Sequence, residues 1–220
     1  MLIIKGEDKF MDKLSNKKDD IFEAAVYLFY MKGYSATSIR DIAGRAGGNS
    51  ANIAYHFQHK QGLLEYCFTD FFEGYISGIE NIAEQLPLIG PKECVLKYTK
   101  FCLHYYREKF LLTRLVLREI SVDSSLNREI YTTYLSKEKF YINLFLDAGM
   151  DCGELKKINP SMFVMKLKAL LNEPFIQAQY FSEVWQLFTN ELYFINKYQL
   201  EIERFLNDCL FEERVCPVPI

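Results

Sequence analysis

The sequence lacks the features of a membrane or secreted protein. It contains no run of about eighteen apolar residues, which a membrane-spanning helix requires. Its first residues include no apolar stretch long enough for a signal peptide, and its six cysteines include no Cys-x-x-Cys pair. We therefore expect a cytoplasmic protein with reduced cysteines, several of them buried as small hydrophobic side chains.

Short enzyme motifs are also missing. We find no Glu-x-x-His, no Gly-x-Ser-x-Gly and no phosphate-binding loop. His56 and His59 are three residues apart, but no cluster of cysteines or carboxylates lies near them in the sequence. The sequence therefore predicts neither an enzyme nor a metal site, and no cofactor.

Charge of either sign is not in large excess. The 26 basic and 29 acidic residues give a net charge of -3, which favours neither nucleic acid nor a membrane surface. The balance is uneven, because residues 1–65 hold nine Lys or Arg and eight Asp or Glu, and the acidic excess lies in the rest. A slightly positive first part on an acidic body is compatible with DNA binding.

Hydrophobic residues make up 50% of the 220-residue chain, enough to bury a substantial core. Their spacing is helical, and no segment alternates with the period of two that a strand shows, so we predict an all-α fold. We expect a flexible tail over 1–15 and a helix-turn-helix DNA-binding domain over 16–62. A helical regulatory and dimerisation domain should follow over 63–212, and a second tail over 213–220.

Turn residues set the expected helix limits. In the first domain, Ser15 or Asn16 is expected to begin a helix that Gly33 ends, and Gly47 and Gly48 form the turn before a short helix that continues to Phe57. In the second domain we expect helices over 92–108, 110–121, 125–151, 161–181 and 190–211, and a kink at Pro174.

The two short helices around Gly47 and Gly48 have the outline of a helix-turn-helix. Small and polar side chains near the start of the second helix suit base edges, and Tyr55, His56 and Lys60 suit phosphates. Helix pairs joined by glycine also occur as plain packing, so spacing alone leaves both interpretations open. The candidate DNA-binding residues are Thr37, Ser38, Arg40, Asn49, Ser50, Ala51, Asn52, Tyr55, His56 and Lys60.

The segment from Lys17 to Tyr66 resembles the N-terminal part of TetR-family regulators. The matching residues are Phe22, Ala25, Leu28, Phe29, Gly33, Tyr34, Thr37–Ala43, Tyr55, His56, Phe57, Lys60, Leu63 and Leu64. The resemblance implies a homodimer with an N-terminal DNA-binding domain and a palindromic operator. The turn at Gly47–Ile53 departs from the common pattern, so no base preference can be carried over.

The C-terminal half resembles a narrower group within this family, the RefZ group of spore-forming bacilli. The matching segments are Leu117–Leu126, Arg128–Ile130, Thr133–Lys139, Leu167–Pro174 and Gln179–Val184. This resemblance implies binding to chromosomal motifs near the origin, association with the nucleoid, and interference with the division protein FtsZ during sporulation. A ligand-responsive repressor of unknown effector is the alternative.

Two groups of residues allow both a functional and a structural interpretation. Seven aromatic residues at helical spacing could line an effector pocket, although plain bundle packing is the simpler interpretation; they are Tyr98, Phe101, Tyr105, Tyr106, Tyr131, Tyr134 and Tyr141. A charge-dense tract could bind an acidic partner, because Arg114 and Arg118 lie one turn apart and repel each other. The partner-surface candidates are Arg107, Arg114, Arg118, Glu119 and Glu183.

The last two predicted helices carry broad apolar faces. One helix pair cannot bury both faces against a single body, so we expect a two-fold, four-helix dimer interface. Such a dimer would place two recognition helices about 34–36 Å apart, which matches successive major grooves. The predicted interface residues are Phe163, Leu167, Leu170, Leu171, Leu192, Ile195, Tyr198, Ile202, Phe205 and Leu206.

Overall fold

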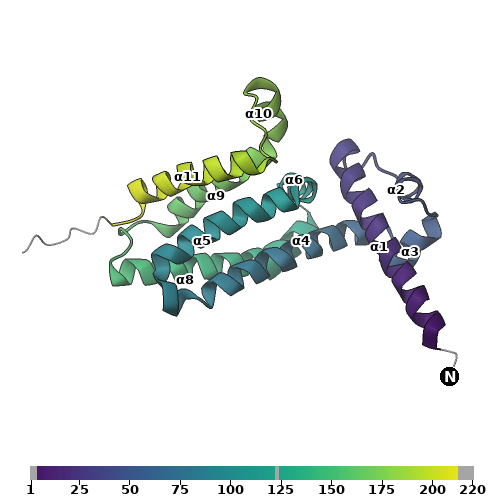
Figure 1. The fold of residues 1–220 in the computed structure, drawn as a ribbon, viewed down its shortest axis with the longest axis horizontal. Helices are drawn as coiled ribbons and strands as arrows, with labels where there is room; N and C mark the ends of the chain where they lie inside the picture. The colour runs from purple at the N-terminus through teal and green to yellow at the C-terminus, as the bar shows by residue number, and fades with distance from the viewer. Residues whose placement is uncertain (1–3, 122–123, 213–220) are drawn as a thin grey trace, which may run out of the picture. The chain divides into compact units, whose positions relative to one another are not determined.

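A computed structural model describes residues 4–121 and 124–212 and confirms the all-α prediction (Figure 1). One isolated β-bridge joins Leu155 to Phe211, and the other regular structure of the described residues is helical. Within that part of the chain, no helix is both long enough and apolar enough to cross a membrane. The expected tail over 213–220 lies outside the described residues.

The chain divides into two compact units. The first comprises Met1–Phe71 with Leu111–Val122, and the second comprises Phe72–Phe110 with Asp123–Ile220. The division falls inside a continuous helix rather than at the expected boundary after residue 62, and it assigns the segment Leu111–Val122 to the first unit. Because a helix can end one core and begin the next, sequence periodicity gave no sign of this boundary.

Five helices contribute to the first unit: α1 (Ile4–Lys32), α2 (Ile39–Arg45), α3 (Ser50–Phe57), the first part of α4 (Lys60–Ala83) and most of α6 (Phe110–Glu119). α1 begins at Ile4, so the expected flexible tail is wrong for residues 4–15, and a cap at Ser15 or Asn16 is wrong as well. Residues 1–3 lie outside the described part.

Local signals set the ends of the short helices as predicted. Gly33 has a φ of +84°, and its N–H donates to the Phe29 carbonyl 3.0 Å away, as expected at the end of a helix. Ser38 and Asp41 form a reciprocal capping box at the start of α2. Gly47 has a φ of +59°, and the Asn49 side chain then caps α3.

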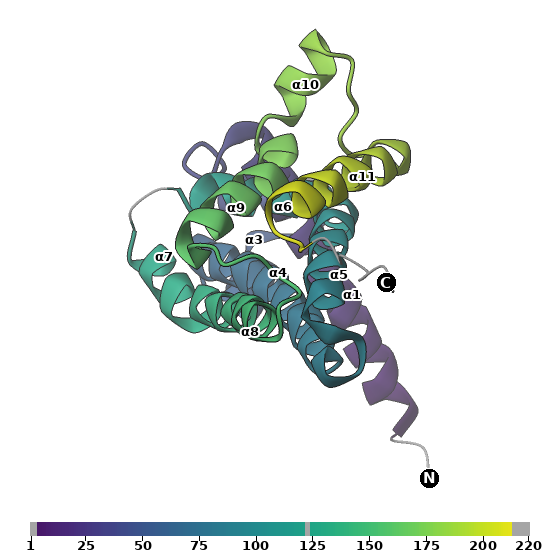
Figure 2. The same cartoon turned by 90° about the vertical axis from the view of Figure 1, so that its left-hand side faces the viewer.

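The second unit is a helical bundle. It contains the rest of α4, α5 (Leu86–Glu108), α7 (Ser125–Ile130), η1 (Tyr131–Leu135), α8 (Ser136–Cys152), α9 (Pro160–Ile176), α10 (Ala178–Val184) and α11 (Leu192–Cys209). α5 packs against α8, α9 and α11, whereas α10 stands apart from the layer that α9 and α11 form, as Figures 1 and 2 both show.

Three helix limits in this unit differ from the predictions. The expected helix over 125–151 contains a π-helical turn, η1, between α7 and α8. Pro174 lies within α9, and the break comes at Gln177 instead. α5 begins at Leu86 and contains a break at Gly90, whose φ is +77°. A proline disturbs the preceding turn of a helix without necessarily ending it, which is why helix α9 continues past it.

A buried polar cluster lies in the core of this bundle. The Lys168 Nζ atom lies 2.7 Å from the Glu138 Oε1 atom, and the hydroxyls of Tyr75 and Tyr98 donate to the same oxygen at 2.5 and 3.0 Å. These four side chains come from α9, α8, α4 and α5. Burial alone would raise the pKa of Glu138, but Lys168 and the hydroxyl donors outweigh it and lower that pKa.

Candidate nucleic-acid interface

α3 presents a small, polar outer face. Ile53 and Phe57, one turn apart, are buried at 0% and 5% exposure and fix the orientation of the helix. The opposite positions Ser50, Ala51 and Ala54 are exposed. Tyr55 follows them with 73% of its surface exposed, unusually high for an aromatic side chain in a packed domain. The structure therefore exposes Ser50, Ala51 and Tyr55, three of the residues that the sequence predicted for DNA contact.

Lys17 holds the turn between α2 and α3. Its Nζ atom donates to the carbonyls of Ala46 and Gly47, the latter at 3.0 Å. A Cβ atom at Gly48 would lie 2.9 Å from the Lys17 Cε atom, so the glycine leaves room for this side chain. Sequence reasoning missed this role, because the partners are about thirty residues apart and no local pattern connects them.

The corner between α3 and α4 is tightly packed. Gln58 adopts a φ of +63°, and the Gly62 N–H donates to the His59 Nδ1 atom at 2.9 Å. A Cβ atom at Gly62 would lie 2.3 Å from the Phe57 carbonyl oxygen, closer than any real contact. Gly62 is therefore required for α3 to end against the first turn of α4.

Lys60 has an internal role that the sequence did not predict. Its Nζ atom donates to the carbonyls of Tyr34 and Thr37, each at 3.0 Å, and lies 4.3 Å from the centre of the Tyr34 ring. Two of its three N–H donors are therefore used within the unit. The third N–H donor remains for the phosphate contact that the sequence predicted, and that contact stays a prediction.

Thr37 is wrong as a DNA-binding residue. Its side chain is 1% exposed, and its hydroxyl lies within hydrogen-bond distance of the carbonyls of Leu28 and Gly33, so it ties the end of α1 to the start of α2. Ser38 is exposed but uses its hydroxyl in the capping box. Arg40, the second residue of α2, is exposed.

The side chains of Asn49, Asn52 and His56 differ in hydrogen bonding, burial and protonation. The Asn49 Oδ1 atom accepts from the Asn52 N–H at 3.1 Å, which leaves the Asn49 amide N–H groups to donate elsewhere. Asn52 is half-buried. Burial and the nearby Lys18 ammonium both hold the pKa of His56 below its usual value, so the imidazole is neutral at neutral pH.

The arginines of the charge-dense tract are engaged inside the first unit. Arg114 donates to the Tyr30 hydroxyl at 2.6 Å. Arg118 donates to the carbonyls of Phe29 and Tyr30 at 2.8 and 3.2 Å, and pairs with Glu119 at 3.1 Å. The carbonyls in the last turn of α1 thus accept hydrogen bonds from the arginine that the sequence interpretation assigned to an outside partner.

The other partner-surface candidates lie in the second unit. The Nε atom of Arg107 is buried and has no hydrogen-bond partner among the described residues. Glu183 is exposed on α10 and accepts from the Gln179 amide at 2.9 Å. The five candidates of this tract are therefore divided between the two units.

The predicted dimer interface needs correction. Six of its residues are at most 6% exposed in the single chain and belong to its core: Phe163, Leu167, Leu171, Ile195, Ile202 and Leu206. Leu170, Tyr198 and Phe205 are half-buried, and Leu192 is 46% exposed. α9 and α11 use these apolar faces against each other and α5, for example by stacking Phe163 on Phe205 at 6.4 Å.

Comparisons with known proteins agree with this geometry. Residues 21–67 match the family described as bacterial regulatory proteins, tetR family. The chain is 40% identical over 186 residues to YttP of Bacillus subtilis (strain 168), described as a probable HTH-type transcriptional regulator; the match covers 84% of this chain and 90% of that protein. The transcriptional repressor KstR2 of Mycolicibacterium smegmatis is 29% identical over 70 residues, 32% of this chain and 34% of that protein.

Solved structures show the same fold over most of the chain. The TetR family transcriptional regulator PfmR from Thermus thermophilus superposes with a TM-score of 0.68 at 23% identity, covering 84% of this chain and 97% of that one. The ketosteroid transcriptional regulator KstR2 of Mycobacterium tuberculosis gives a TM-score of 0.68 at 14% identity, covering 89% and 95%. At these identities the likeness concerns the fold alone.

Proposed function

Because the chain belongs to the TetR family of bacterial regulatory proteins and is a DNA-binding transcriptional regulator of that type, we propose that it works as a homodimer on a palindromic operator. Each subunit inserts α3 into one of two successive major grooves. The observation that carries the proposal is the outer face of α3, where Ser50, Ala51 and Tyr55 are exposed beside a buried Ile53.

The residues of this surface divide into two roles. Asn49, Ser50 and Asn52 offer donors and acceptors near the start of α3, the part of a recognition helix that reaches base edges. Ala51 allows close approach to the groove floor. Tyr55, His56 and Arg40 lie toward the flanks and contact phosphates, which position the protein without reading sequence. A neutral His56 donates one hydrogen bond there without adding charge.

Homodimerisation uses the outward side of α9. The interface residues that the sequence predicted are instead mostly buried in the core of the single chain. Met162, Met165 and Ile176 are exposed at 52%, 61% and 45%, and with Ala169 they follow a helical stripe along α9. Methionine adapts to an irregular apolar partner surface. Leu192, Tyr193 and Leu200 extend this apolar surface onto α11, where they are 46%, 72% and 47% exposed.

The resemblance to the RefZ group supports a second proposal, that the dimer marks chromosomal sites and acts on FtsZ. The separate hypothesis of a partner surface included Arg114 and Arg118, and both donate hydrogen bonds to α1 in the structure. Mapping of bound sites in cells separates the two roles. Sites clustered around the origin support the division role, whereas one site beside the protein's own promoter supports ordinary repression.

The ligand-responsive alternative depends on the aromatic residues of the second unit. Tyr98 and Tyr106 are 1% and 2% exposed, and Tyr106 packs edge-on against Phe175 at 5.3 Å. This arrangement favours bundle packing for these rings. An inducer would reveal itself as a small molecule that lowers operator affinity without binding DNA.

The test begins with a palindrome recovered from site mapping. Tyr55→Ala should weaken binding about tenfold or more, because an exposed phosphate contact is lost while the fold is retained. Tyr131→Ala, another exposed tyrosine, lies in the second unit and should leave affinity unchanged. Equal affinity for the palindrome and its isolated half-site would argue against the dimer, and failure to bind any duplex at low salt would overturn the proposal.

A further inference from the structure

α10 stands off the bundle with apolar side chains facing solvent. Figures 1 and 2 show the helix projecting away from the layer of α9 and α11. Val184 is 62% exposed, Trp185 60% and Tyr180 48%, although all three are large apolar or aromatic residues. Only part of the segment is anchored, since Ala178 is buried and Phe181 half-buried. We call residues 178–185 the arm.

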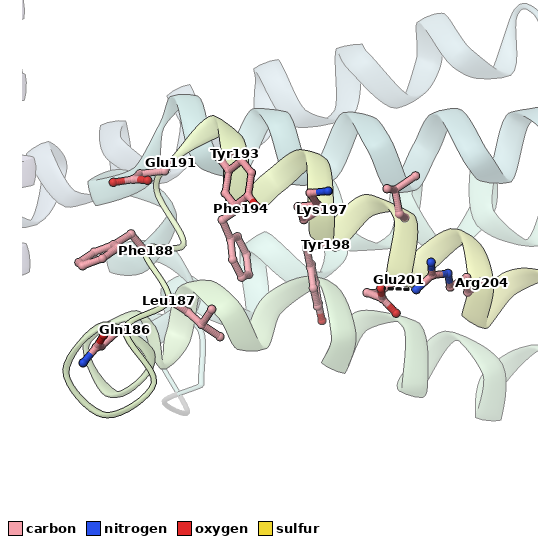
Figure 3. A pocket seen from close by; sticks show the side chains of 11 residues that line it. Gln186, Leu187, Phe188, Glu191, Tyr193, Phe194, Lys197, Tyr198, Glu201 and Arg204 are labelled. Atoms are coloured by element: carbon pink, nitrogen blue, oxygen red, sulfur yellow. Dashed lines mark hydrogen bonds and ion pairs between the residues drawn. The ribbon is translucent and has the colours of Figure 1, made fainter.

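A groove of about 530 Å³ lies beside the arm on the same unit. One wall is the loop after the arm, with Leu187 and Phe188, and the other is the outer side of α11 (Figure 3). Phe194 and Tyr198 stack at 5.3 Å along its length, and the Tyr198 hydroxyl donates to the Leu170 carbonyl, so this wall is rigid. Tyr193, Lys197, Leu200 and Arg204 are also among the lining residues.

The arm of a chain does not fill the groove of the same chain. If it did, Val184 and Trp185 would be buried, whereas each exposes about three-fifths of its surface. The groove walls are also open, because Leu187 and Phe188 are 43% and 50% exposed. One chain therefore carries an unfilled apolar groove and an uncovered apolar projection, which is what a two-fold contact between identical surfaces requires.

We propose that the arm of each subunit docks in the groove of its partner, so that two copies of this chain exchange arms. The proposal rests on the homodimer proposed above and adds where the dimer is fastened. Ile176 of the α9 stripe lies two residues before the arm, and Tyr193 and Leu200 of the exposed apolar surface of α11 line the groove, so an exchanged arm continues the surface proposed for the dimer. A projection from the face that meets the partner must lie against the partner.

Trp185 reports on the arm directly, because it is the only tryptophan of the chain. Sedimentation and tryptophan emission are measured on the same dilution series of the full-length protein. As dimers form, Trp185 emission should shift to shorter wavelength and quenching by acrylamide should fall. A dimer whose Trp185 stays fully accessible would overturn the exchange and leave the dimer standing. Buried Trp185 emission in the monomer would overturn it too, because the arm would then fold back on its own chain.

Substitutions on both sides of the contact sharpen the test. Val184→Asp in the arm and Leu200→Asp in the groove should each raise the dimer dissociation constant about tenfold or more. Phe140→Asp on α8 is the matched control, since Phe140 is also 62% exposed but lies outside the groove and the arm, and it should change little.

The double variant decides whether the two residues meet. If Val184 of one subunit contacts the groove of the other, combining both substitutions should cost much less than the product of the single effects. Independent, multiplicative effects would count against arm exchange. A protein that stays monomeric at every concentration and on operator DNA would instead refute the homodimer itself, so the two failures are distinguishable.

Discussion

Different interactions stabilise the interior of each of the two units. In the first unit, the cations Lys17, Lys60 and Arg118 donate to backbone carbonyls near helix ends and turns. In the second, the cation Lys168 is paired with the buried carboxylate of Glu138 inside a four-helix core. The first arrangement fixes the helices of the first unit at their ends and turns. The second joins the central parts of α4, α5 and α9 to the first turn of α8.

The largest effect should come from breaking the buried pair. Lys168→Met leaves the Glu138 charge without its partner, which costs about 3 kcal/mol of unfolding free energy. We take the lower end of the usual range because 24% of the Lys168 side chain is exposed. Urea denaturation measures the loss. Adding Glu138→Leu should recover most of it; a double variant as unstable as the single one would show that packing, not charge, is responsible.

The same pair should make the second unit sensitive to acid. The pKa of Glu138 is lowered in the folded chain, because the Lys168 ammonium and the hydroxyl donors outweigh its burial. A carboxyl of this kind stabilises the fold above its unfolded pKa of about 4.3, and that stabilisation is lost as the pH falls through the folded pKa. The stability difference between wild type and the double variant should therefore move in the variant's favour below about pH 4. Parallel pH profiles would contradict this.

In the first unit the largest effect should come from Gly62. Gly62→Ala forces the new Cβ atom against the Phe57 carbonyl, so α3 must shift, at a cost of about 2 kcal/mol and most of the operator affinity. Gly44→Ala is the matched control, because nothing lies within 4 Å of its Cβ position on α2. That change should leave stability equal or slightly higher. Thermal unfolding and operator titration measure both variants.

Lys60 and Arg40 were both predicted to bind DNA, but substituting them should change different quantities. Lys60 should affect the stability of the fold, and Arg40 the salt dependence of DNA binding. Lys60→Met removes two donors to carbonyls and should cost about 1.5 kcal/mol, with little change in the salt dependence of DNA binding. Arg40→Ala should leave stability within about 0.5 kcal/mol and lower the salt slope by about 0.9, the contribution of one phosphate contact. If Lys60→Met lowered the slope equally, its ammonium would be a phosphate ligand after all.

The contrast also explains which predictions succeeded. Gly33 and Gly47 shape the backbone within a few residues, so their roles could be read from the sequence. Lys17 acts on carbonyls about thirty residues away, and Arg118 on carbonyls 88 and 89 residues away. No local pattern encodes such pairs. The contacts that hold the recognition helix in place were therefore missed, although the helix itself was found.

The prediction of the dimer surface was wrong for a related reason. α9 and α11 are apolar on more than one side, and a broad apolar face does not reveal which part meets the same chain and which part meets another. Leu167 and Leu171 enter the core, whereas Met162 and Met165 of the same helix remain exposed. Only the packing of α5 against both helices decides between these sides.

Among the cations that donate to backbone carbonyls, Arg118 should show the smallest effect, and its substitution tests whether it serves only the stability of the first unit. Arg118 is 44% exposed and donates to the last carbonyls of α1, so Arg118→Ala should cost about 0.5–1 kcal/mol of unfolding free energy. Arg118→Lys should restore only part of this, because one ammonium cannot reproduce the two-pronged contact of the guanidinium. Stability and operator affinity should fall together and only slightly. A variant with unchanged stability and operator affinity that no longer affects cell division would contradict this. Arg118 would then be a contact for another protein rather than a stabilising residue of the first unit.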